Sequence, residues 1–117
     1  MIQVTIPYRL PSMANARLHW VAKARIVKDQ RQLVTMFLGR WPRPALPVTV
    51  RLTRIAPRAL DGDNLQGAFK ACRDSVATWL GVDDADTRVV WEYAQSKGGA
   101  KRYAIVIEVE SPAVATK

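Results

Sequence analysis

Residues 61–84 read DGDNLQGAFKACRDSVATWLGVDD, a run in which two aspartate pairs flank an amphipathic segment. Asp63 or Asn64 can cap a helix that continues to Leu80, and Gly81 is a typical C-terminal stop. Lys70 projects from the face opposite the apolar stripe. The stripe predicted to be buried comprises Leu65, Phe69, Cys72, Val76, Trp79 and Leu80.

The segments on either side of this helix predict a small α+β domain. Alternating apolar residues indicate strands, and a basic amphipathic stretch indicates another helix. The predicted order is strand, helix, strand, helix, strand, strand: a mixed sheet of about four strands packed with two main helices in one domain, residues 1–117. The predicted ranges are strands at 2–6, 48–53, 88–96 and 102–110, a helix at about 16–39, a hairpin turn at 97–101 and a frayed tail at 111–117.

The residue counts exclude several classes of site. A single cysteine, Cys72, excludes an intramolecular disulfide and a cysteine-based zinc site, and its apolar surroundings favour an inert core thiol. A single histidine, His19, excludes a site of several imidazoles, and a structural role is favoured for it over DNA contact. No apolar run approaches the length of a membrane span, and the N-terminus does not resemble a signal peptide. We therefore expect a cytoplasmic protein with no membrane partner.

The charge distribution points to a polyanionic partner. The net charge is +8 and the pI is about 10.3, which favours nucleic acid. Residues 61–86 nevertheless hold six acids and two bases, whereas the rest of the chain holds sixteen bases and four acids. Carboxylates that face DNA repel its phosphates unless they bind cations that bridge to the phosphate. An acidic island inside a basic chain therefore predicts a metal site.

The candidate metal ligands are Asp61, Asp63, Asp83 and Asp84. A D-x-D motif alone is more typical of a turn with a helix cap, so the prediction depends on both pairs. Oxygen ligands select hard cations, which here predicts Mg²⁺ with Mn²⁺ as a possible substitute. Such ions support phosphodiester hydrolysis. The pairs can meet only if the third strand folds back beside the second.

Basic side chains around this island are candidates for DNA contact. Lys70 could orient the phosphate, or it could simply pair with Asp74 one helical turn later. The basic face of the first helix is equally consistent with a solvated surface. The predicted DNA-binding residues are Arg17, Arg25, Lys28, Arg31, Arg58, Lys70 and Arg73.

The run Asp61-Gly62-Asp63-Asn64-Leu65, followed by Lys70, Asp74 and then Asp83-Asp84 before a valine-rich strand, resembles RusA-type Holliday junction resolvases. The resemblance implies a homodimeric, Mg²⁺-dependent endonuclease of phage or prophage origin that resolves four-way DNA junctions by paired symmetric nicks in recombination and repair. It also implies that Asp61, Asp63 and Asp84 are the catalytic carboxylates with Asp83 beside them. Many members carry a lysine where this chain has Gly67.

Two other functions remain open on the sequence. In a non-catalytic nucleic-acid-binding protein of phage origin, the basic face would bind phosphate and the acidic loops would serve only as helix caps and turns. A general or flap-type nuclease would use the same carboxylates on a different DNA structure.

Overall fold

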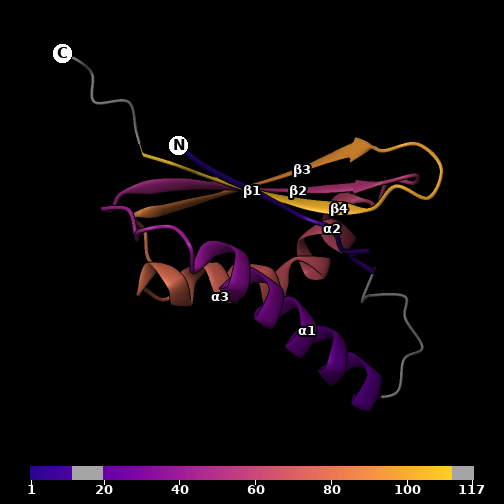
Figure 1. Ribbon diagram of the computed structural model, residues 1–117, viewed down its shortest axis with the longest axis horizontal. Coiled ribbons are helices and arrows are strands. Elements are labelled where there is room, and N and C mark those ends of the chain that lie inside the picture. The colour runs from indigo at the N-terminus through magenta and orange to yellow at the C-terminus, as the bar shows by residue number, and fades with distance from the viewer. Residues whose placement is uncertain (12–19, 112–117) are drawn as a thin grey trace.

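The computed structural model describes residues 1–11 and 20–111 (Figure 1). The predicted α+β fold with a four-stranded mixed sheet is confirmed. None of the described helices is long and apolar enough to cross a membrane. The elements are β1 (Ile2–Ile6), α1 (Trp20–Leu38), β2 (Val48–Ala56), α2 (Gly62–Ala68), α3 (Lys70–Leu80), β3 (Val89–Lys97) and β4 (Ala104–Glu110).

The sheet has the strand order β1-β4-β2-β3, with β4 antiparallel to both neighbours and β3 parallel to β2. The predicted hairpin at residues 97–101 is therefore wrong, because β2 lies between β3 and β4. The connection instead crosses the end of β2, where Gly98 N donates to Ala56 O at 3.2 Å. A Cβ at Gly98 would lie 2.6 Å from Cγ2 of Ile55, so this close crossing requires glycine.

The helices cover one face of the sheet and leave the other face open (Figure 1). The period-2 pattern places alternate residues of β2 and β4 in the core beneath the helices. On the open face, Arg51 pairs with Glu92 of β3 at 2.9 Å. The core residues of these two strands that face the helices include Val48, Val50, Leu52, Ile105, Ile107 and Val109.

The predicted single helix from residue 63 or 64 to Leu80 is two helices. They meet at Phe69, which has φ −89° and ψ 1° and is completely buried. The offset between α2 and α3 lets Phe69 reach the core, where its ring lies 6.1 Å from that of Tyr93. Gly81 ends α3 in the left-handed conformation, as predicted.

The cap of α2 is Asp61, rather than Asp63 or Asn64. Its Oδ1 accepts a hydrogen bond from Asn64 N at 2.9 Å, in the geometry of a carboxylate N-cap. The helix begins earlier than predicted because Gly62 and Asp63 already have helical backbone conformation. Asp63 thereby becomes a first-turn residue whose carboxylate is left for other contacts.

Candidate functional site

The first aspartate pair lies just beyond the C-terminal end of β2, and both carboxylates face solvent. Oδ1 of Asp61 is taken by the cap of α2, but its Oδ2 makes no hydrogen bond or ion pair among the described residues. Asp63 makes no such contact at all within residues 1–11 and 20–111. Neither Asp61 nor Asp63 thus has a cationic partner among the described residues of this basic chain.

Two side chains hold the backbone that leads into this pair. Gln95 of β3 accepts from Leu60 N at 2.7 Å and donates to Leu60 O at 2.6 Å, as a neighbouring strand would. Arg54 of β2 donates to Arg58 O at 2.6 Å. Because both ends of residues 58–60 are tied to the sheet, the position of Asp61 is fixed relative to β2 and β3.

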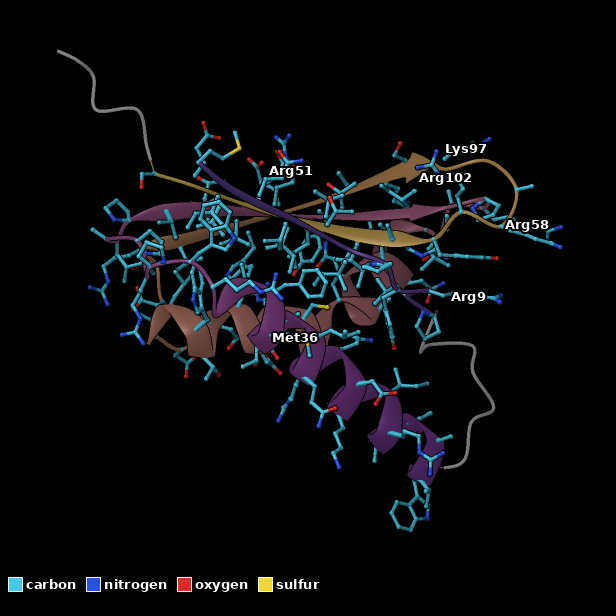
Figure 2. All side chains as sticks on the ribbon, viewed as in Figure 1. Arg9, Met36, Arg51, Arg58, Lys97 and Arg102 are labelled. Carbon is cyan, nitrogen blue, oxygen red and sulfur yellow. The ribbon has the colours of Figure 1, made fainter. Side chains whose placement is uncertain are left out.

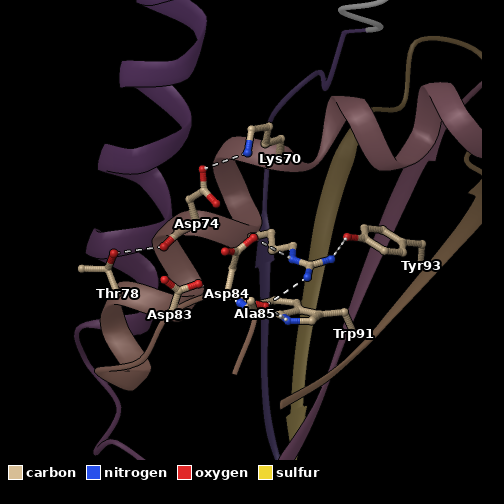
Figure 3. A network of polar contacts seen from close by, with 9 residues as sticks. Lys70, Asp74, Thr78, Asp83, Asp84, Ala85, Trp91 and Tyr93 are labelled. Carbon is tan, nitrogen blue, oxygen red and sulfur yellow. Dashed lines mark hydrogen bonds and ion pairs between the residues drawn. The ribbon is translucent and has the colours of Figure 1, made fainter. Parts of the chain in front are cut away.

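The second aspartate pair lies in the loop between α3 and β3 (Figure 3). Asp84 O accepts from Arg73 at 3.0 Å and from the indole of Trp91 at 3.1 Å. Nε of Arg73 also lies 3.4 Å from Oδ2 of Asp84, an ion pair without a hydrogen bond. Asp83 accepts from Ala85 N at 2.9 Å, and this backbone hydrogen bond lowers the pKa of Asp83.

Arg73 is the centre of this second region. In addition to Asp84 it donates to the hydroxyl of Tyr93 at 3.0 Å and lies 4.8 Å from the ring centroid of Trp91. These contacts commit its guanidinium to protein partners, and its role in DNA contact stays a prediction. The arrangement fixes the carboxylate of Asp84 against α3.

The two aspartate pairs are not brought together within one chain. β3 does fold back beside β2, as the prediction required, but it runs parallel to β2. The Asp83–Asp84 loop therefore precedes the shared start of the two strands, whereas Asp61 and Asp63 follow the end of β2. Across residues 1–11 and 20–111, no group of three or more acidic, histidine or cysteine side chains could hold a metal ion.

The remaining predicted residues lie on several surfaces. Lys70 begins α3 and its Nζ is 3.8 Å from Asp74 Oδ2, the i,i+4 pair considered from the sequence. Arg25, Lys28 and Arg31 are exposed on α1, whereas Arg17 lies outside the described residues. Cys72 is buried, and burial raises the pKa of its thiol to about 12, as expected of an inert core cysteine.

Sequence reasoning identified Arg58 but not the pocket that it lines. This pocket, of about 490 Å³, lies between the end of β1, the end of β2 and the start of β4. Arg9 and Arg58 extend from this end of the sheet, where Lys97 and Arg102 also gather (Figure 2). No sequence motif links these residues, because they come from three separate segments. The lining residues are Arg9, Leu10, Pro11, Arg54, Ala56, Pro57, Arg58, Leu60 and Tyr103.

Comparison with known proteins finds sequence similarity but no described activity. No family model matches the chain. A protein of Xylella fastidiosa, described as an uncharacterized protein, is 34% identical over 96 residues, which cover 72% of this chain and 61% of the relative. The chain thus spans less than two thirds of that relative's length, and the relative's description carries no activity to transfer.

Proposed function

We propose that this chain is a metal-dependent endonuclease that cuts branched DNA as a homodimer. The observation that carries the proposal is the exposed Asp61–Asp63 pair, which has no cationic partner among the described residues of a chain with net charge +8. Unpaired carboxylates oppose DNA binding on such a chain unless a cation lies between them and the phosphate. The resemblance to RusA-type resolvases supports a four-way junction as the substrate.

The residues present fit a magnesium ion. Mg²⁺ is commonly held by one or two carboxylates together with water and substrate phosphate oxygens, and Asp61 and Asp63 offer three uncommitted oxygens. A bound Mg²⁺ or Mn²⁺ would supply an activated water and charge neutralisation for phosphodiester hydrolysis. The chain itself contributes the anchored loop before Asp61, which holds the pair in place. Asp83 and Asp84 would add negative charge to complete the site.

Because the two aspartate pairs lie apart within one chain, we place the proposed metal site between two subunits and call it the composite site. Asp84 is held by Arg73 and Trp91, and Leu60 is held by Gln95, so neither loop can move far without breaking hydrogen bonds. A second copy related by a two-fold axis can instead place its own Asp83–Asp84 loop against Asp61 and Asp63. Two-fold symmetry makes every such contact twice, so a dimer would hold two equivalent sites.

Cleavage of a synthetic labelled four-way junction tests the proposed activity. The controls are a linear duplex and a flap substrate, each in Mg²⁺, in Mn²⁺ and in EDTA. We expect paired symmetric nicks in the junction that require metal. Cutting of the flap alone would support the flap-nuclease alternative, and binding without cleavage under every metal condition would contradict an endonuclease.

Mixing two inactive variants tests the composite site. Asp63→Asn and Asp84→Asn homodimers should each lose cleavage, whereas a heterodimer keeps one site with both native pairs. Subunit exchange should then restore roughly a quarter of the wild-type sites, because half of the dimers are mixed and each has one intact site. Nicks should occur on one strand only. If each chain held a complete site of its own, the mixture would stay inactive.

A non-catalytic nucleic-acid-binding protein is the second candidate. It is favoured by the cap that Asp61 provides to α2 and by the lack of a three-ligand cluster among the described residues. This candidate predicts salt-sensitive DNA binding that EDTA leaves unchanged.

A further inference from the structure

We propose that the pocket lined by Arg9, Arg54, Arg58 and Tyr103, here called the arginine pocket, binds one nucleotide of a DNA strand through its phosphate. The inference deepens the proposed function and rests on it for the identity of the strand. It assigns a second DNA contact beside the aspartate pair, because Leu60 lines the pocket and Asp61 is the next residue.

Arg54 is the fixed element of the pocket. The residue is only 9% exposed, and it donates through Nε to Leu10 O at 3.2 Å and through Nη1 to Arg58 O. Its Nη2 makes no hydrogen bond within the part of the chain that the structure describes, and it is not sealed from solvent. A buried guanidinium held by two carbonyls with one nitrogen uncommitted is a preformed anion donor.

The charge around Arg54 is not neutralised by any of the residues that the structure describes. None of the ion pairs among the described residues includes Arg9, Arg54 or Arg58, and no described acidic side chain lines the pocket. Burial, together with the nearby charge of Arg9, lowers the pKa of Arg54. Since unpaired buried charge is costly, an anion that enters the pocket would relieve this repulsion.

The remaining walls favour a nucleotide over a bare phosphate ion. Arg9 is held against the ring of Tyr103, with its guanidinium carbon 4.8 Å from the ring centroid. Leu10, Pro11 and Pro57 supply apolar surface, and the volume of about 490 Å³ exceeds what a phosphate needs. A smaller pocket that shares Arg54 and Arg58 also includes Lys97, so the basic surface extends beyond the arginine pocket.

The test is an NMR titration of the full chain in EDTA, which prevents metal-dependent cleavage. The probe is hexathymidylate, and inorganic phosphate is titrated in parallel. We expect saturable shifts of the Arg54 Nε–H and Tyr103 ring resonances with hexathymidylate, at far lower concentration than with phosphate. Equal response to both ligands would show a free-phosphate site, and unmoved Arg54 and Tyr103 resonances would also overturn the proposal.

The variants Arg58→Gln and Arg9→Gln locate the binding. Each removes one charge, and Arg58→Gln leaves intact the backbone carbonyl that Arg54 uses. Each should weaken hexathymidylate binding about tenfold, as the loss of a charge-assisted hydrogen bond predicts. The matched control is Arg40→Gln, which removes an exposed arginine between α1 and the start of β2 and should change affinity less than twofold. Equal losses in all three variants would show delocalised attraction and contradict the pocket.

The test of the arginine pocket can succeed or fail independently of the test for junction cleavage. Saturable binding in the pocket without junction cleavage in any metal would overturn the endonuclease and support the pocket. Metal-dependent junction cleavage with unmoved Arg54 resonances would overturn the pocket and support the endonuclease.

Discussion

The two aspartate pairs belong to regions of opposite character. In the loop before β3, Asp84 faces Arg73, Asp83 accepts a backbone amide, and Asp86 forms a 2.7 Å ion pair with Arg88. After β2, Asp63 and the outer oxygen of Asp61 have no partner among the described residues, although basic side chains gather at the same end of the sheet. In the second region, before β3, the acids are held by protein partners. The first region, after β2, holds both signs of charge without pairing them among the described residues, which fits the proposed metal and DNA contacts.

The largest effect is expected at Asp61, where two variants distinguish its role as a helix cap from its proposed role in metal binding. Asp61→Asn keeps a good N-cap but removes the charge, so cleavage should fall at least about a hundredfold while stability is nearly unchanged. Asp61→Ala should lose the same activity and also about 1 kcal/mol of stability. Junction cleavage and urea unfolding measure the two quantities. Normal cleavage by Asp61→Asn would show that the residue is only a cap.

The next largest effect is expected at Arg73, and it tests whether the contacts around the Asp83–Asp84 loop, the second region, stabilise the fold. Arg73→Lys keeps the charge but cannot donate at once to Tyr93 and to Asp84 O. We expect a loss of about 2 kcal/mol, measured by urea unfolding, because charge-assisted hydrogen bonds are broken. Tyr93→Phe, which removes only one of these bonds, should cost about 1 kcal/mol. Equal stability of Arg73→Lys and wild type would show that the Arg73 contacts contribute little.

The sequence predicted the fold more completely than it predicted how the candidate site residues are arranged, for a physical reason. Periodicity reports burial, so the strands and the stop of α3 at Gly81 were predictable. The crossing of β2 at Gly98 was not, because the order of strands depends on long-range pairing that a turn-like sequence does not encode. The arginine pocket was missed for the same reason, since Arg9, Arg54 and Tyr103 are far apart along the chain.

Gln95 gives a further test of the first region, through a residue that positions Asp61 from a distance. Gln95→Leu removes both hydrogen bonds to Leu60, so the loop before Asp61 should loosen. We expect about 1 kcal/mol less stability and a larger fractional loss in cleavage than in junction binding. Higher Mg²⁺ should restore part of the activity if the loop only weakens metal binding. Unchanged cleavage would show that the two Gln95 hydrogen bonds do not position Asp61 and Asp63.

The smallest effect is expected in the pH dependence of the Tm, which distinguishes an acid in an ion pair from an acid without a described partner. The hydrogen bonds from Arg88 lower the pKa of Asp86 from 3.8 to about 2. A depressed folded pKa contributes stability above the unfolded value, and this contribution disappears as pH falls through the folded value. Asp86→Asn should therefore lower the Tm at pH 7, and its gap from wild type should close between about pH 4 and pH 2. Asp63→Asn, which removes a carboxylate with no described partner, should show no such gap at pH 7. A pH-independent gap for Asp86→Asn would mean that the Asp86 charge is not what stabilises this loop.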